Sequence, residues 1–376
     1  MKRRTLLAGV GAVALGGSLW RRAVMSDTGG GSFSYGPLGE ADELGIRLPE
    51  GFSARLIARS TVEVPGTGHV WHGAPDGGAC FAHGDGWIYV SNAELDDGKG
   101  GASAVRFDAD GTILDAYPIL SGTDRNCAGG ATPWRTWLSC EEVEHGAVFE
   151  TDPYGGVAAV KRPAMGRFRH EAAAADFDRF VIYLTEDEPD GCFYRFVPDS
   201  WGDLSSGVLQ VLGGPNGATV WIDVPDPAAA ETPTRHQVAG AGHYDGGEGC
   251  HYAGGVCYFT TKGDNRVWAF DAEASTLSVL YGAGAPLFGV DNLTGTPGGD
   301  LFVAEDGGDM EICVIAPGGT VTPFLQVTGQ DLSELCGVAF NPAGDRLYFS
   351  SQRGPSDDND DGRTYEVTGP FRFDPV

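Results

Sequence analysis

One short pattern recurs six times along the chain and constrains its fold more than any other feature. In each copy a turn residue precedes a run of aromatic and β-branched residues that ends in a small residue, as in FVIYLT at residues 180–185. Such runs between glycine, proline and aspartate turns predict strands. The final small residues are at positions 91, 139, 185, 260, 304 and 350, so their spacings are 48, 46, 75, 44 and 46 residues.

These spacings predict an all-β fold with a closed repeat architecture. The period is about 46 residues, within the roughly 40–50 that a four-stranded propeller blade requires. One spacing is longer by about 29 residues, which indicates an insertion near residues 198–236. We therefore predict a six-bladed β-propeller over residues 45–376, closed by pairing of residues 51–58 with residues 364–367.

The N-terminus has the pattern of an export signal. A basic tripeptide, KRR, precedes an apolar stretch rich in glycine and alanine, which is the arrangement of a twin-arginine signal over residues 1–25. The apolar stretch is shorter than the roughly 18 residues of a membrane-spanning helix. We expect the twin-arginine machinery to export the protein to the periplasm or the cell exterior, with membrane contact only through an uncleaved signal. Residues 26–44 are the predicted linker.

Charge and cysteine spacing exclude two classes of site. The 376 residues include 52 Asp plus Glu and 25 Lys plus Arg, so the formal net charge is −27. Because such a surface repels a phosphate backbone, we expect no nucleic-acid partner. The eight cysteines are spread singly without a Cys-x-x-Cys pair, so they do not indicate a zinc site.

Acidic residues recur at two positions of the repeat. The first set lies 12 to 14 residues before the aligned small residue and consists of Gly78, Cys127, Glu171, Glu248, Asp291 with Asn292, and Cys336. The second set follows the small residue and consists of Asn92, Glu94, Glu141, Glu142, Glu186, Asp187, Lys262, Glu305, Asp306, Gln352 and Arg353. Innermost strands start at the mouth of the central tunnel, so we expect the first set to converge there.

This concentration of carboxylates predicts bound cations. Like-charge repulsion around one axis is costly unless cations neutralise it. Carboxylate and amide oxygens suit Ca²⁺, whereas a thiolate at Cys127 suits a softer, redox-capable ion such as iron. The alternative for Cys127 is a buried apolar environment, which is the usual place of a lone cysteine.

Several segments carry a resemblance to a known family. The run RNCAGGATPW at residues 125–134, continued by TWLSCEE at 136–142, resembles the PhoX family of alkaline phosphatases. Weaker similarities are RHEA at 169–172, YLTED at 183–187 and YFTTKGDNRV at 258–267. The resemblance covers roughly residues 45–370. It implies a six-bladed propeller, exported by the twin-arginine route, whose mouth holds an iron and calcium cluster that hydrolyses phosphomonoesters.

The resemblance also implies roles for individual residues. By motif position Cys127 is the iron thiolate, and the carboxylate ligands are Glu141 or Glu142, Glu171 and Glu248. The blade alignment adds Asp291, Asn292, Glu305 and Asp306 as metal ligands. Lys262 and Arg353, the basic residues of the second set, are the candidates to hold phosphate oxygens during catalysis.

One departure from the family leaves the function open. Gly246 and Gly247 precede Glu248 where the resemblance implies Arg-Pro-Glu, and loss of a phosphate-binding arginine costs about 2–4 kcal/mol of transition-state stabilisation. The leading hypothesis is a monomeric hydrolase of small phosphoesters that uses metal-ion catalysis. The alternatives are a calcium-dependent lactonase or esterase resembling the gluconolactonase propellers, and a non-catalytic binding propeller stabilised by calcium.

Overall fold

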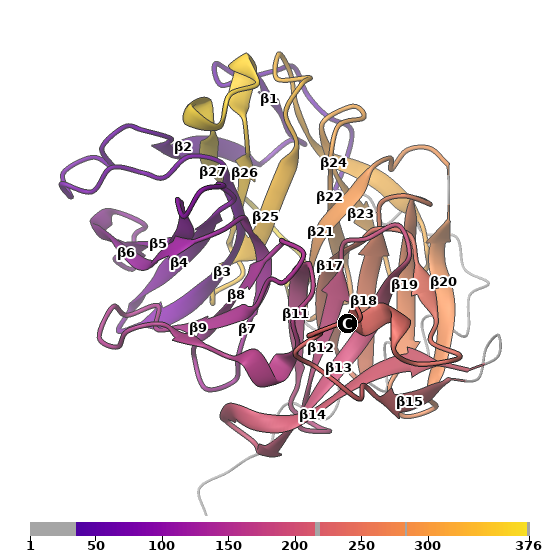
Figure 1. Ribbon diagram of the computed structural model, residues 1–376. Helices are drawn as coiled ribbons and strands as arrows, with labels where there is room; N and C mark the ends of the chain where they lie inside the picture. Colours follow the sequence, from indigo (N-terminus) through magenta and orange to yellow (C-terminus); the bar gives the residue numbers. More distant parts are fainter. Residues whose placement is uncertain (1–34, 215–218, 283, 374–376) are drawn as a thin grey trace, which may run out of the picture.

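The computed structural model describes residues 35–214, 219–282 and 284–373, and its regular structure there is almost entirely β-strand. Six antiparallel sheets stand around a central axis (Figure 1). The described residues contain no α-helix, only the 3₁₀ turns η1 (Pro163–Met165), η2 (Thr234–His236), η3 (Gly354–Ser356) and η4 (Asn359–Asp361). The prediction of an all-β, six-bladed propeller is therefore confirmed.

The first three blades follow one another along the chain, each beginning with its innermost strand. Blade 1 contains β3 (Pro75–His83), β4 (Gly86–Ala93), β5 (Gly100–Phe107) and β6 (Ile113–Thr123). Blade 2 contains β7 (Asn126–Ala131), β8 (Trp137–Glu141), β9 (Val148–Thr151) and β10 (Val160–Lys161). Blade 3 contains β11 (His170–Asp176), β12 (Val181–Glu186), β13 (Gly191–Ser200), β14 (Asp203–Gly213) and β15 (Val220–Asp223), and β16 (His243–Tyr244) pairs with β13.

The last two blades take their outermost strand from the N-terminal part of the chain. Blade 4 contains β17 (Gly247–Ala253), β18 (Val256–Thr261), β19 (Arg266–Asp271) and β20 (Thr276–Gly282). Blade 5 contains β21 (Val290–Gly295), β22 (Leu301–Glu305), β23 (Glu311–Ile315) and β24 (Val321–Val327), with β1 (Ile46–Arg47) at its edge. Blade 6 contains β25 (Leu335–Phe340), β26 (Arg346–Ser351) and β27 (Arg363–Thr368), and is completed by β2 (Ser53–Arg59).

The ring closes where the sequence predicts it. In blade 6, Ala54 of β2 lies opposite Val367 of β27, and Leu56 lies opposite Tyr365. The six repeated runs become the second strands of the blades, namely β4, β8, β12, β18, β22 and β26. Pairing of an N-terminal strand with a C-terminal strand in one sheet protects the edge that an open propeller would expose.

Aromatic side chains from neighbouring blades stack in the core. The rings of Phe193 in blade 3 and Phe259 in blade 4 are stacked with their centroids 4.2 Å apart. Tyr89 in blade 1 and Tyr348 in blade 6 are stacked at 4.7 Å, and the Trp87 indole donates a hydrogen bond to the Tyr348 hydroxyl. Each such pair contributes about 0.5–1.5 kcal/mol beyond its buried area, so the blades are held at fixed angles around the axis.

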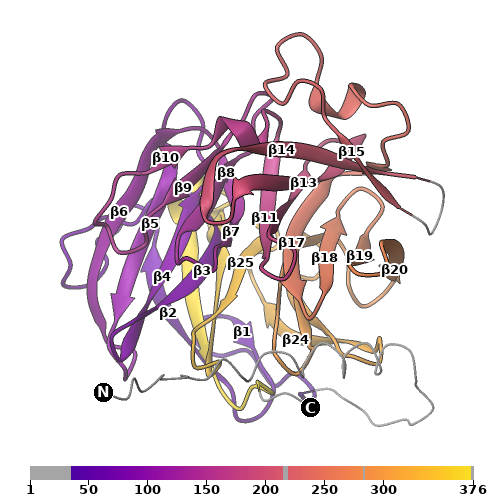
Figure 2. The ribbon, with the colours of Figure 1, turned by 90° about the horizontal axis from the view of Figure 1, so that it is seen from below.

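The predicted linker and the predicted insertion both contribute to the core, since Tyr35 and Leu44 pack against it and Leu204 and Leu209 are buried in it. The predicted signal, residues 1–25, is outside the described residues. Residues 35–44, the described part of the predicted linker, precede β1, and the Tyr35 hydroxyl donates a hydrogen bond to Asp300. The segment 198–236 runs through β14, β15 and η2 at the outer edge of blade 3 (Figure 2). None of the described segments is a helix long and apolar enough to cross a membrane.

Candidate metal centre

The first strand of every blade is irregular where it faces the tunnel. Register shifts follow Pro75, Asn126, His170, Gly247, Val290 and Cys336, one in each inner strand. A bulge of this kind re-aims the side chains around it. In blades 1 to 5 the residue just after the start of the shift lines one cavity, and these five form the inner ring: Asp76, Cys127, Glu171, Glu248 and Asp291.

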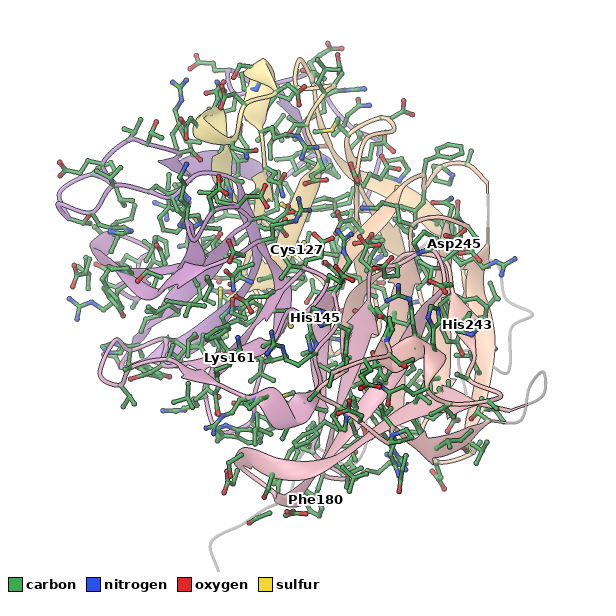
Figure 3. The ribbon with its side chains drawn as sticks, in the orientation of Figure 1. Cys127, His145, Lys161, Phe180, His243 and Asp245 are labelled. Atoms are coloured by element: carbon green, nitrogen blue, oxygen red, sulfur yellow. The ribbon has the colours of Figure 1, made fainter. Side chains whose placement is uncertain are left out.

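A second layer of side chains comes from the loops that follow the second strands. This loop ring consists of Glu94, Glu142, Asp187, Lys262, Asp306 and Gln352, one from each blade. The cavity between the two rings has a volume of about 340 Å³. Figure 3 shows Cys127 near the middle of the propeller and Phe180 at its periphery. Side chains from all six blades therefore meet at one site.

Backbone hydrogen bonds hold the loop ring in the same way in all six blades. The N–H of each loop-ring residue donates to the carbonyl of a residue that we call the lead residue, over 2.7–3.2 Å. The lead residues are Ala74, Arg125, Arg169, Gly246, Gly289 and Glu334. In blades 1 to 5 the lead residue lies two positions before the inner-ring residue. Arg125, Arg169 and Glu334 themselves line the cavity.

The acidic donors form four overlapping groups of three whose ligand atoms lie within 4.8 Å of one another. The groups are Asp76, Glu94 and Cys127; Cys127, Glu142 and Glu171; Glu171, Glu248 and Asp291; and Asp291, Asp306 and Glu334. Successive groups share one residue. Because one carboxylate or thiolate can bridge two metal ions, this arrangement fits several neighbouring cations better than one isolated cation.

Burial makes the charged forms of these groups costly without cations. Burial raises the pKa of Asp291 to about 7 despite the nearby Lys262 ammonium, and the Asp306 carboxylate raises it further. Burial raises the pKa of Glu94 to about 7 against the influence of Arg125. Burial raises the pKa of Glu171 well above its usual value, and the charge of Glu248 raises it further. A bound cation stabilises the charged forms of these carboxyl groups. The donor set therefore fits a metal cluster.

The one thiol in the cavity lies among these carboxylates. Cys127 Sγ is 3.2 Å from Glu171 Oε1. Burial raises the pKa of the Cys127 thiol well above its ordinary value, and the charges of Asp76 and Glu171 raise it further. Burial and the neighbouring carboxylates therefore disfavour the thiolate that binds metal, and a bound cation would stabilise it.

Comparison with known proteins identifies the family. A family model described as "Alkaline phosphatase PhoX" matches residues 95–280. The chain belongs to the PhoX alkaline phosphatase family. The structure of Pseudomonas fluorescens PhoX in complex with vanadate, a transition state analogue, is similar with a TM-score of 0.74, 17% sequence identity and coverage of 89% of this chain and 97% of that chain.

A gluconolactonase from Xanthomonas campestris is also similar, with a TM-score of 0.53, 13% identity and coverage of 90% of this chain and 99% of that chain. At these identities the solved structures show a shared fold alone. No curated protein matches the sequence.

Most residues predicted from the PhoX resemblance and the blade alignment meet in the cavity. Those that line it are Cys127, Glu142, Glu171, Glu248, Asp291, Asp306, Lys262 and Arg353. Lys262 Nζ lies 2.9 Å from Glu248 and 3.1 Å from Asp306. Arg353 Nη1 lies 3.1 Å from Glu334.

Glu141 and Glu305, which the sequence predicts as metal ligands, do not line the cavity. Glu141 is the last residue of β8, and its carboxylate accepts a hydrogen bond from Ala147 N, six residues later. Glu305 is the last residue of β22 and accepts from Glu311 N, again six residues later. Both carboxylates therefore join the second strand of a blade to the start of the third strand. Glu186 makes the same contact with Cys192 N.

Three further residues of the first set lie outside the cavity lining, namely Gly78, Asn292 and Cys336. Asn292 is placed one residue beyond Asp291, and its Oδ1 accepts from Gly337 N, 2.8 Å away. Cys336 is buried, with its Sγ 3.2 Å from the carbonyl of Pro75. In blade 6, Glu334 faces the cavity instead.

Some cavity residues were not among the predicted site residues: Asp76, Glu94, Arg125, Arg169, Asp187 and Glu334. Asp76 and Glu334 each lie two residues before the positions that the repeat alignment selected, Gly78 and Cys336. An acidic residue within two positions of the expected strand start was the signal that could have found them.

Proposed function

We propose that this protein is an exported, metal-dependent phosphomonoesterase with iron and calcium in the cavity of its propeller. The observation that carries this proposal is the series of overlapping donor groups, one thiol included, in a PhoX-family chain. The vanadate complex of the P. fluorescens relative supports a phosphoryl group as the substrate group that such a cavity receives.

The charge of the cavity supports more than one cation. Ten acidic residues line it, namely Asp76, Glu94, Asp96, Glu142, Glu171, Asp187, Glu248, Asp291, Asp306 and Glu334. Four basic residues line it, namely Arg125, Arg169, Lys262 and Arg353, so the formal balance is 4 − 10 = −6. A single divalent ion leaves −4. This deficit favours a multinuclear centre over the single calcium ion of the lactonase hypothesis.

The donor types suggest which ions bind where. Cys127, with Glu142 and Glu171, would hold iron, because a thiolate suits a softer ion than calcium. The all-carboxylate groups around Asp291 would hold calcium, which prefers oxygen ligands. When bound, such cations offset negative charge on a transferring phosphoryl group.

The chain's own side chains would orient the substrate. Lys262 and Arg353 reach the cavity from two different loops, so each can donate hydrogen bonds to a phosphoryl oxygen. Every side chain of the lining except the Cys127 thiol is charged or an amide. A lining of this kind favours a charged group, such as a phosphate, over an uncharged lactone ring.

Metal analysis combined with activity tests this proposal. Protein folded in a twin-arginine-competent host is analysed for iron and calcium and assayed with p-nitrophenyl phosphate, a phosphodiester and a lactone in calcium-containing buffer. We expect both metals and hydrolysis of the monoester. Calcium without iron, or hydrolysis of the lactone alone, would contradict the proposal. Glu171→Gln is the matched inactive control, because Glu171 belongs to two donor groups.

Export needs its own experiment. Changing both arginines of the N-terminal KRR to lysine keeps the charge but removes the twin-arginine pattern. We expect the altered protein to stay in the cytoplasm and the wild type to reach the periplasm or medium as a monomer. Normal export of the altered protein would contradict the proposed route.

A further inference from the structure

Two arginines from neighbouring blades share one carboxylate in the cavity. Arg125 Nη2 lies 2.7 Å from Glu142 Oε2, and Arg169 Nη2 donates a hydrogen bond to Glu142 Oε1. Glu142 is only 4% exposed. Both arginines are lead residues, so their backbones occupy equivalent positions in blades 2 and 3. The two guanidinium groups therefore lie side by side on one sector of the mouth.

In this sector the number of cations relative to the carboxylates in contact with them is higher than around Lys262 or Arg353. Lys262 is one cation between two carboxylates, those of Glu248 and Asp306. Arg353 is likewise one cation in contact with two carboxylates, those of Glu334 and Asp357.

In the sector of the paired arginines, two cations contact two carboxylates. Besides Glu142, Arg125 contacts Glu94 at 2.5 Å, whereas the only ion pair of Arg169 among the described residues is with Glu142. The carboxylates of Asp187 and Glu188 are further acidic neighbours of Arg169, without an ion pair to it. A phosphoryl dianion is attracted most to the part of the wall with the smallest excess of carboxylates.

The two guanidinium groups retain unused donors. Within the described residues, the hydrogen bonds and ion pairs of Arg125 and Arg169 use Nη2 alone, and the Nε atom of each is buried without a hydrogen-bond partner. A guanidinium carries five N–H donors in a planar fork that matches two oxygens of a phosphate. Each side chain as a whole is 34% exposed, so a bound oxyanion can reach the exposed part of each guanidinium group.

The backbone of Arg125 is fixed by its position in the blade. Its φ of 43° lies in the left-handed region, which costs a non-glycine residue free energy. Two backbone hydrogen bonds hold it there, from its own N–H to Leu95 O and from Glu142 N to its carbonyl, both 2.8 Å long. Ala74, the lead residue of blade 1, has nearly the same φ of 41°, so the conformation belongs to the lead position, and from this position the Arg125 side chain reaches the cavity.

We propose that Arg125 and Arg169 form a clamp that binds the oxygens of the substrate's phosphoryl group, with Glu142 holding the two guanidinium groups in place. This inference rests on the proposed phosphatase function and adds the residues that position its substrate. The clamp selects a tetrahedral oxyanion, since two forked donors on one side can bind two or more of its oxygens at once.

The clamp is tested with inorganic phosphate and orthovanadate as ligands of the metal-loaded protein. The variants are Arg125→Met, Arg169→Met, both together, and the double lysine variant, which keeps the charge but removes the fork. Arg266→Met is the matched control, because Arg266 pairs with Asp264 and does not line the cavity. Calorimetric dissociation constants are measured alongside iron and calcium content.

We expect each methionine variant to weaken phosphate binding about tenfold or more, as for loss of a charge-assisted hydrogen bond. The double lysine variant should keep its metals and still bind phosphate weakly, and Arg266→Met should match the wild type. If the wild type binds phosphate and the double variants bind it equally well, the clamp is overturned while the phosphatase function stands. If the wild type neither binds phosphate nor hydrolyses the monoester, the proposed function and the clamp both fail.

Discussion

The thiol of Cys127 lies 3.2 Å from a carboxylate oxygen of Glu171, and the two residues occupy equivalent positions in neighbouring blades. Each is the first residue after the start of a register shift in its inner strand. A thiol and a carboxylate so close together, both buried, share a cation more readily than a proton when metal is available. The contact thus joins the softest donor of the cavity to the hard donors of the next group.

Replacing Cys127 with serine is expected to remove iron and leave calcium largely in place. Serine has nearly the same size, but its hydroxyl is a poor ligand for a soft ion compared with a thiolate. Hydrolysis of a phosphomonoester should fall with the iron content. Elemental analysis of the purified variant measures the effect. A Cys127→Ser protein with its full iron content would exclude Cys127 from the metal centre.

Removal of the metals should make stability fall as pH rises. In the metal-free protein, burial raises the pKa of Asp291 and of Glu94 to about 7. A carboxyl group with a raised pKa binds its proton more tightly in the folded state, so its stabilising effect is present at low pH and lost as pH rises through about 7. After chelation we expect a higher Tm at pH 5.5 than at pH 8, and the metal-loaded protein should not show this decrease.

The matched variant for this experiment is Asp291→Asn. Removing one of the titrating groups should flatten the decrease of Tm in the chelated protein. A chelated wild type that is more stable at pH 8 than at pH 5.5 would show that the carboxylates are not crowded in solution as they are in the structure.

The repeat pattern predicted the architecture because each blade must bury its second strand. FVIYLT and its five counterparts are those strands, and their spacing set the number of blades. The pairing of β2 with β27 followed from ring closure. Within the site, the alignment selected Cys127, Glu171 and Glu248, which line the cavity, because they lie 12 to 14 residues before the aligned small residue.

The rest of the site could not be predicted because it depends on the local path of the backbone. In blade 6 the residue that faces the cavity is Glu334, not Cys336. Side chains of adjacent residues at a strand end point to opposite faces, so Glu142 faces the cavity while Glu141 binds a backbone N–H. Sequence alone does not distinguish the two members of such a pair.

The pair of Glu305 and Asp306 tests this division of roles. Glu305 accepts hydrogen bonds from Phe288 N and Glu311 N through different oxygens. In Glu305→Gln one of these N–H groups faces an amide NH₂, so we expect a decrease of about 2 kcal/mol in the free energy of unfolding. The metal content should be unchanged. Denaturant unfolding and elemental analysis measure the two quantities.

Asp306→Asn is the matched control, and it should lower the calcium content with a smaller effect on the stability of the chelated protein. If instead Glu305→Gln lowered the calcium content and Asp306→Asn destabilised the chelated protein more, Glu305 would be the metal ligand and Asp306 the structural residue. Glu305, Glu311 and Cys313 also have ligand atoms within 4.8 Å of one another, so a cation lost specifically from Glu305→Gln would show that this buried group binds metal.

The lead position of blade 4 offers a gain-of-function test. Gly246 is equivalent to Arg125 and Arg169, because its carbonyl accepts the N–H of the loop-ring residue Lys262. Its φ is 68°, and an added Cβ would first meet the end of the Asp187 side chain at 3.3 Å. A side chain therefore has room there, at a backbone cost of about 1–2 kcal/mol. Ala74 and Arg125 already adopt similar values of φ at this position.

We expect Gly246→Arg to bind phosphate several-fold more tightly than the wild type, because it adds a further guanidinium at the mouth, on the blade next to that of Arg169. Its Tm should be lower because of the backbone cost. Gly246→Ala separates the two effects, since it has the same backbone cost without a guanidinium and should bind phosphate no more tightly than the wild type. If Gly246→Arg and Gly246→Ala bind phosphate equally, the lead position of blade 4 does not reach the substrate, and substrate binding depends on the blades that carry Arg125 and Arg169.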